Sequence, residues 1–136
     1  MAIVTIARQL GSGGYVIAEE VARRLGYRLI GSDQLIDAAE EYGYVKPELE
    51  EVHEKRPNLI TRFFTMRHKA YLDMIQTIIY DFASQGNVVI MGRAATILLR
   101  DVPSALRVHI YCPFEVRVER LMRDEGLTRE IAEQLV

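Results

Sequence analysis

The sequence predicts an α/β fold, a three-layer sandwich in which helices cover both faces of a parallel sheet. Short apolar runs alternate along the chain with longer segments of helical period, which is typical of parallel strands joined by helical crossovers. Two of the runs are almost continuously apolar, as strands covered on both faces should be. The predicted strands are residues 3–7, 27–30, 88–91 and 106–111.

The helix between the first two strands is predicted from one apolar stripe, and Gly26 ends it. The stripe consists of Gly14, Ile17, Ala18, Val21, Ala22 and Leu25. A second helix begins near Ser32 or Asp33 and stops at Gly43.

Further helices are predicted in the second half of the chain. A polar stretch from 45 to 57 is followed by a strongly periodic segment over 58–84, and a short helix spans about 94–100. Pro113, at a first helical position, leads a helix to about Glu125, and Thr128 caps the last one. We therefore expect a single domain over 1–136, with a helical excursion at about 44–84.

The composition is that of a soluble domain with a core large enough to stand alone: 136 residues, 49% hydrophobic and 26% charged. The formal charge of −2 excludes a bulk basic field of the kind that attracts nucleic acids or anionic membranes. The single cysteine, Cys112, cannot pair within the chain, and no apolar run reaches the roughly 18 residues of a membrane helix. We expect a cytoplasmic protein without nucleic-acid or membrane partners.

The residues that directly follow each strand are the candidate ligand-binding residues, because ligands of open parallel sheets bind beyond the carboxyl ends of the strands. The segments that follow the four strands are Arg8 to Gly14, Gly31 to Asp33, Gly92-Arg93, and Cys112-Pro113.

The segment after the first strand is the most informative. Gly11, Ser12, Gly13 and Gly14 open directly into a helix, so their backbone N–H groups could surround a phosphate. The nucleotide-binding pattern G-x-x-x-x-G-K-[ST] has a lysine and a hydroxyl where this chain has Gly14 and Tyr15, and Arg8 replaces its first glycine. Either an anion site or a tightly packed turn would explain the glycines, and the charge of Arg8 favours the anion site.

Four segments in register along nearly the whole chain resemble the cytidylate-kinase-like family, relatives of the nucleoside monophosphate kinases. They are the runs IARQLGSGGYVIA from Ile6, LIGSDQLI from Leu29, VIMGRAA from Val89 and VHIYCPFEVRVERL from Val108. The resemblance implies a P-loop kinase fold, ATP as phosphoryl donor with Mg²⁺ held mainly by the substrates, and CMP or a related monophosphate as acceptor.

The resemblance also implies roles for individual residues. Residues 11–14 would cradle the donor phosphates, with Tyr15 where the family has a basic residue, and Arg8 and Arg93 would be catalytic. Ser32, Asp33 and Arg93 would bind the acceptor. Ala94 stands where relatives place the aspartate of the monophosphate-binding motif, which weakens the expected recognition of cytosine. Met91 stands where relatives often place an aspartate that orders Mg²⁺, so no protein ligand to a metal is expected.

The resemblance places the helix after the fourth strand on the way to a lid that closes over the phosphates. Arg117, Arg120 and Arg123 recur on this helix, and a solvated helix face is the alternative interpretation of them. The resemblance also implies a lid with arginines, a fifth strand and a closing helix, which the predicted elements up to Val136 do not include, so we expect weak nucleotide binding and little or no turnover. We also expect an open sheet edge beside the fourth strand, which could pair with another copy to form a homodimer.

The leading hypothesis from sequence is therefore a nucleoside monophosphate kinase-like enzyme. The alternatives are a non-catalytic nucleotide- or anion-binding module of the same fold and a purely structural dimerisation domain.

Overall fold

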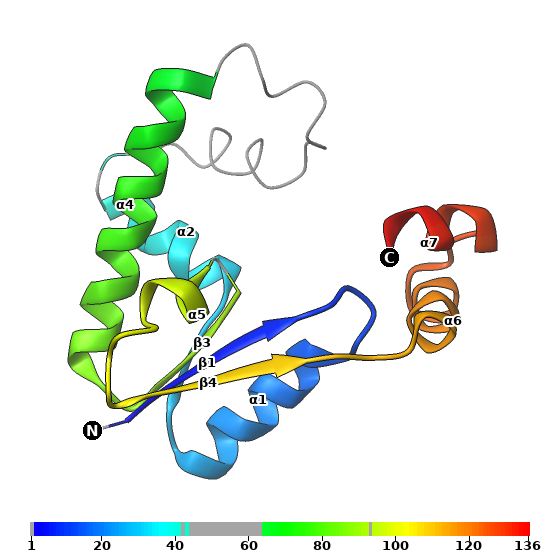
Figure 1. Ribbon diagram of the computed structural model, residues 1–136, viewed down its shortest axis with the longest axis horizontal. Helices are drawn as coiled ribbons and strands as arrows, with labels where there is room; N and C mark the ends of the chain where they lie inside the picture. Colours follow the sequence, from blue (N-terminus) through cyan, green and yellow to red (C-terminus); the bar gives the residue numbers. More distant parts are fainter. Residues whose placement is uncertain (1, 42, 44–63, 93) are drawn as a thin grey trace.

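A computed structural model describes residues 2–41, 43, 64–92 and 94–136 of the chain. Four parallel strands form one sheet in the order β2-β3-β1-β4. The strands are β1 (Ile3–Arg8), β2 (Arg28–Ile30), β3 (Val88–Met91) and β4 (Ala105–Ile110). Helices cover both faces of this sheet (Figure 1), so the predicted three-layer α/β architecture is confirmed.

The helices follow the strands in the expected alternation. Their bounds are α1 (Gly14–Leu25), α2 (Ser32–Glu41), α4 (Phe64–Gln85), α5 (Ala95–Leu98), α6 (Phe114–Glu125) and α7 (Arg129–Leu135). The last two helices lie together beyond the carboxyl ends of β1 and β4 (Figure 1).

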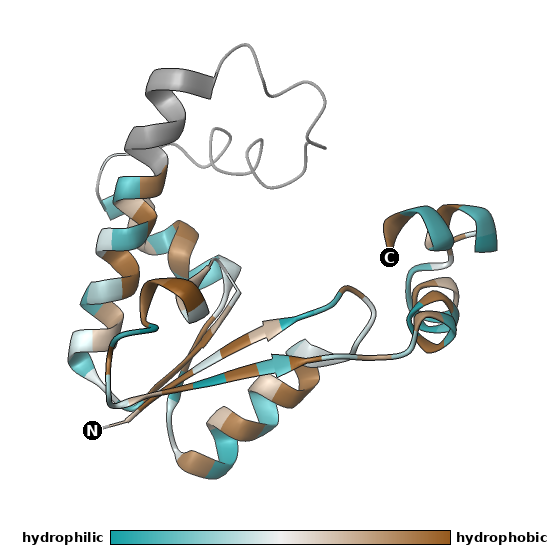
Figure 2. Cartoon of the chain, viewed as in Figure 1, coloured by the Kyte–Doolittle hydropathy of each residue, from teal (hydrophilic) through white to brown (hydrophobic). Residues whose placement is uncertain are grey.

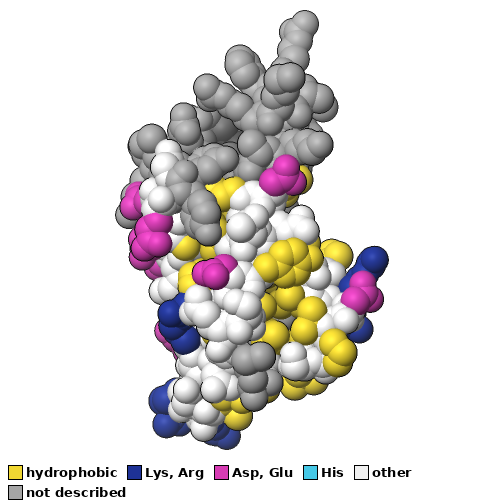
Figure 3. All heavy atoms as spheres, turned by 90° about the vertical axis from the view of Figure 1, so that its left-hand side faces the viewer, with side chains coloured by type: hydrophobic (Ala, Val, Ile, Leu, Met, Phe, Trp, Pro, Cys, Tyr) yellow, Lys and Arg dark blue, Asp and Glu magenta, His cyan; other side chains and the backbone are white. Residues whose placement is uncertain are grey.

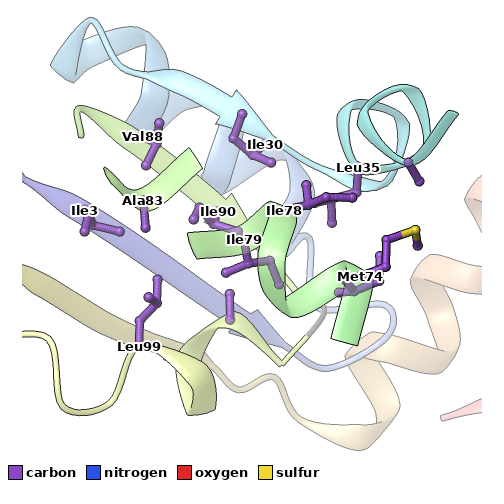
Figure 4. Close-up of a cluster of buried hydrophobic side chains, with 13 residues drawn as sticks. Ile3, Ile30, Leu35, Met74, Ile78, Ile79, Ala83, Val88, Ile90 and Leu99 are labelled. Carbon is purple, nitrogen blue, oxygen red and sulfur yellow. The ribbon is translucent and has the colours of Figure 1, made fainter. Parts of the chain in front are cut away.

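Two apolar cores lie on opposite faces of the sheet because successive residues of β1 point in opposite directions. Ile3 packs with residues of α2, α4 and α5, whereas Val4 and Ile6 pack against α1. Figure 4 shows the first core, and Figure 2 shows apolar segments in the strands and alternating apolar and polar residues in the helices. Val118, Leu121 and Ala132 form a separate small core between α6 and α7.

The structure confirms most of the apolar stripe predicted for α1, but two residues predicted at the margins of the stripe are exposed. Gly14, Ala18 and Ala22 are buried, whereas the side chains of Ile17 and Leu25 are 43% and 49% exposed. The helix meets β1, β2 and β3 through these small residues. Because the contact strip is narrow, the two larger side chains remain outside it.

Helix and strand ends differ slightly from the prediction. Pro113 is the N-cap of α6 rather than its first helical residue, and β2 begins at Arg28 instead of Tyr27. The Thr128 cap is confirmed, since its side-chain oxygen accepts a hydrogen bond from the Ile131 amide at 3.4 Å. The predicted polar stretch at 45–57 and the start of the following periodic segment lie outside the described residues.

One edge of the sheet is formed by β4, which has only β1 as a neighbour among the described strands, and β2 forms the other edge. Leu106 and Tyr111, at the β4 edge, are 62% and 72% exposed. Pairing of this edge with a second copy stays a prediction. No described helix combines the length and apolar character needed to cross a membrane.

The α4 side of the molecule also carries exposed apolar side chains (Figure 3). Leu72, Tyr80 and Ile97 are the large exposed apolar residues of α4 and α5. The Tyr80 hydroxyl donates to the Leu98 carbonyl at 3.4 Å and so joins the two helices.

The core between the sheet and α4 should dominate stability. Ile79 is fully buried there, so Ile79→Ala should lower the free energy of unfolding by about 2–5 kcal/mol through lost burial and a residual cavity. Ile97, 66% exposed on α5, is the matched control, and its alanine variant should cost less than about 0.5 kcal/mol. Urea unfolding midpoints measure both, and equal shifts would contradict this assignment of the core.

Candidate phosphate-binding site

The loop between β1 and α1 has the backbone conformation of an anion-binding turn. Gly11 and Gly13 have φ angles of +75° and +76°, in the left-handed region that only glycine enters without strain. Gly13 is also the N-cap of α1, so the loop opens directly into the first turn of that helix. The positive end of the helix dipole therefore lies at this loop.

Close packing accounts for two of the glycines. A Cβ at Gly11 would lie 2.7 Å from the backbone oxygen of Arg117, and one at Gly14 would lie 2.6 Å from the Arg8 Cβ. At Gly13 the nearest atom to such a Cβ would be Arg120 Nη1, at 3.4 Å. Tight packing thus explains Gly11 and Gly14, while Gly13 borders more open space.

Hydrogen bonds within the loop leave several amides available. The Ser12 amide donates to the Gln9 carbonyl at 3.1 Å, and the Gly14 amide donates to the buried Ser12 Oγ at 3.3 Å. The amides of Gly11, Gly13 and Tyr15 have no acceptor within the described residues. Ser12 therefore organises the loop from inside, and the Gly11, Gly13 and Tyr15 amides are among the donors that an anion could use.

The loop is fastened to the segment that follows β4. The Gln9 amide donates to the Ile110 carbonyl at 3.2 Å, and the Cys112 amide donates to Gln9 Oε1 at 2.9 Å. These two bonds hold the loop and the start of α6 together.

Arg8 lies between the loop and the carboxyl end of β3. Its Cβ packs against Gly14, and its Nη1 lies 2.9 Å from where a Cβ of Gly92 would be. The Gly92 amide in turn donates to the Ile6 carbonyl at 2.9 Å. Arg93 follows Gly92 but is outside the described residues, so its predicted place in the same crevice stays a prediction.

The three arginines of α6 have different surroundings. Arg117 is used within the protein: its Nε donates to the Cys112 carbonyl at 3.1 Å and its Nη1 to the Val136 carbonyl at 3.0 Å. Arg123 is an exposed partner of Asp124, with 2.6 Å between Nε and Oδ1. Arg120 instead reaches the loop, where its Nη1 donates to the Gly11 carbonyl at 3.2 Å.

An open pocket of about 470 Å³ lies between the loop and α6. Its wall consists of residues 8–15 together with Arg120, Leu121, Asp124 and Glu125. The cations Arg8 and Arg120 lie in this wall with the carboxylates of Asp124 and Glu125. The sequence did not predict the two carboxylates of the wall, because no residue spacing in the chain indicates that the end of α6 faces the loop.

Tyr15 occupies the first turn of α1 and is 50% exposed. The negative charge of Glu19 raises the pKa of its phenol, with a smaller contribution from Asp33. The phenol therefore stays protonated at neutral pH.

The predicted acceptor residues Ser32 and Asp33 are exposed at the start of α2, directly after β2. The preceding Gly31 amide donates to Gln34 Oε1 at 2.9 Å, which fixes the turn into this helix. Both side chains thus follow a strand at its carboxyl end, as the loop residues do.

The described residues contain no group of three or more His, Cys, Asp or Glu side chains that could hold a metal ion. A neutral phenol, Tyr15, stands where the nucleotide-binding pattern places a metal-binding hydroxyl.

Comparison with known proteins places this loop and sheet in a known family. The chain is 29% identical over 136 residues to the cytidylate kinase of Ignicoccus hospitalis, a match covering 97% of this chain and 70% of that protein. An uncharacterized protein from Eubacterium ventriosum has a similar structure, with a TM-score of 0.70 and 21% identity, over 97% of this chain and 66% of that one. Shikimate kinase from Acinetobacter baumannii matches with a TM-score of 0.58 and 17% identity, over 98% and 71% of the two chains.

These structures confirm the expected P-loop kinase fold, and this chain spans about two thirds of the length of the Eubacterium ventriosum protein. The model of the cytidylate kinase-like family matches residues 3–136. The protein belongs to the cytidylate kinase-like family.

Proposed function

We propose that the protein is a nucleoside monophosphate kinase-like phosphotransferase that uses ATP to phosphorylate CMP or a related monophosphate. The observation that carries this proposal is the loop at residues 11–14, which lies at the N-terminal end of α1 beside Arg8 and Arg120. Its Gly11 and Gly13 amides have no acceptor among the described residues. Anionic phosphates bind to such an arrangement of backbone donors, dipole and cations.

On the donor side, the amides of Gly11, Gly13 and Tyr15 would bind phosphate oxygens, while Ser12 keeps the loop in shape. On the acceptor side, Ser32, Asp33 and Arg93 would bind the monophosphate. Arg8 would serve both substrates, because its side chain leaves the loop beside Gly14 and carries its guanidinium to Gly92.

The reaction joins a phosphate oxygen of the acceptor to the γ-phosphorus of ATP as the bond between that phosphorus and the β,γ-bridging oxygen breaks, which releases ADP. Catalysis of this transfer is mainly positioning and charge stabilisation. The loop amides and the arginines supply both. Mg²⁺ bound to ATP would neutralise part of the phosphate charge, and it would be held mainly by the substrates.

We further infer one P-loop kinase-like domain over 1–136, with the segment at about 44–84 on the acceptor side. A cytoplasmic location suits a reaction that consumes ATP. A homodimer that pairs through the β4 edge is compatible with this arrangement, since the site lies in the loops beyond the strand ends.

A second candidate function is a nucleotide-binding module without catalysis. The observation that favours it is the loop sequence, in which Gly14 and Tyr15 replace the lysine and hydroxyl residue of the usual pattern.

A coupled assay with ATP and a panel of CMP, dCMP, UMP, AMP and GMP separates these candidates. Turnover with a cytidine monophosphate, reduced at least about tenfold in Arg93→Ala by loss of a charged phosphate contact, would support the kinase. ATP-dependent thermal stabilisation without turnover would support the binding module. No stabilisation by any nucleotide would contradict both and favour a structural domain.

A further inference from the structure

Arg120 is held against the phosphate-binding loop by its own contacts. Its Nη1 donates to the Gly11 carbonyl at 3.2 Å and lies 3.6 Å from the Cys112 sulfur. The same atom lies 3.4 Å from the position of a Gly13 Cβ. The side chain is half-buried, so one end of the guanidinium is anchored at the rim of the loop.

The rest of the guanidinium remains available. The Nε and Nη2 groups of Arg120 have no acceptor in the part of the chain that the structure describes. Neither neighbouring arginine of α6 is available in this way, because Arg117 bonds two backbone carbonyls and Arg123 pairs with Asp124. Arg120 is therefore the α6 cation that is both placed at the loop and able to bind a ligand.

The position of Arg120 matters because few cations line the phosphate-binding pocket. The loop carries Gly14 where the nucleotide-binding pattern has its lysine, so the loop itself has no cation for the terminal phosphates. Of the two cations in the pocket wall, Arg8 lies toward Gly92 and Arg120 lies over Gly13. A polyphosphate on the Gly13 side would meet only Arg120 among these lining cations.

We propose that Arg120 binds the terminal phosphates of the donor nucleotide and so takes the place of the lysine that the loop lacks. This inference rests on the proposed function for the identity of the donor. Guanidinium groups bind phosphate through several donors at once, and the bond to Gly11 positions the group before the ligand arrives. Little ordering is then needed on binding, which favours affinity.

A purely structural role is the competing explanation, because the same bond ties α6 to the loop. The two roles differ in their dependence on phosphate number. A phosphate ligand must matter more for ATP than for AMP, whereas a structural tie must affect both nucleotides alike.

The test compares Arg120→Gln and Arg120→Lys with Arg129→Gln, a control on the neighbouring helix α7 whose exposed side chain pairs with Glu115 and Glu133, outside the pocket. Isothermal titration with ATP, AMP and inorganic tripolyphosphate gives the affinities. Arg120→Gln should weaken ATP and tripolyphosphate binding about 10- to 100-fold, as expected for lost hydrogen bonds to a charged group, and should change AMP binding less than about threefold. Arg129→Gln should leave all three affinities unchanged.

Circular dichroism shows whether each variant is folded. If the glutamine variant is not folded, Arg120→Lys, which keeps the charge but not the planar donor set, should still fold and weaken ATP binding about three- to tenfold.

Equal losses of affinity for ATP and AMP, or unchanged ATP affinity in both variants, would overturn the role of Arg120 while leaving the kinase proposal intact. Tripolyphosphate binding that depends on Arg120, in a protein without kinase turnover, would support Arg120 and contradict the kinase. A parent protein that binds neither ATP nor tripolyphosphate would overturn both.

Discussion

Replacing Gly13 by valine should remove ATP binding, with a loss of at least about 100-fold in affinity. Gly13 has a φ of +76°, where a β-branched residue is strained, so the loop would have to change its backbone conformation. Such a change turns the Gly13 amide and its neighbours away from the positions in which they could bind phosphate. Losing more than one hydrogen bond to a charged ligand accounts for the size of the effect.

The matched control for this variant is Gly26→Val at the other end of the same helix. Gly26 has a φ of +66° and no atom within 4 Å of a Cβ placed on it, so backbone strain is common to both variants. Each should lose roughly 1–2 kcal/mol of stability. Isothermal titration with ATP, alongside urea unfolding, separates loss of the site from loss of stability. ATP affinity that falls equally in both variants, or in neither, would show that the loop is not the site.

The main elements of the fold could be predicted from the sequence because their patterns are local. The four strands are short apolar runs, and the small residues Gly14, Ala18 and Ala22 mark the buried side of α1. The exposure of Ile17 and Leu25 could not be predicted, since it depends on how closely this helix approaches the sheet. That approach is a tertiary property, set by which small side chains meet the strands.

The site was predictable in part, for a similar reason. A glycine-rich turn after a strand identifies the loop, and Arg8 is adjacent to it in sequence. Arg117, Arg120 and Arg123 have the same spacing and charge, so the sequence alone does not distinguish them. Their roles depend on the orientation of α6, which buried Val118 and Leu121 set by packing with Ala132 of α7.

Helix α6 also limits how the loop can vary. A Cβ at Gly11 would meet the backbone of Arg117 and not a flexible side chain, so the loop and α6 cannot both stay in place if Gly11 is replaced. The pocket wall contributed by Arg120 and Asp124 is thus fixed relative to the loop by direct backbone contact.

Arg8→Ala should lower kcat by about 10³-fold or more, the range observed when a transition-state arginine is removed from phosphoryl-transfer sites. The side chain starts against Gly14 of the loop through its Cβ and Cγ, and its guanidinium lies beside Gly92 after β3, a position from which it could contact the transferred phosphoryl group. Because its contribution would be greatest in the transition state, KM for ATP should change much less than kcat. Arg107→Ala, at an exposed position in the middle of β4, is the control and should retain parental kinetics.

A second variant addresses the position of Arg8 without removing it. A Cβ at Gly92 would lie 2.9 Å from Arg8 Nη1, so Gly92→Ala should displace the end of this side chain and reproduce part of the loss. A bisubstrate analogue that joins adenosine and cytidine through five phosphates gives a readout independent of turnover. Since Arg8 would contact both halves, Arg8→Ala should weaken this analogue by a larger factor than it weakens ATP. Equal factors for the two ligands would restrict Arg8 to the donor side, and unchanged affinity for both would remove it from the site.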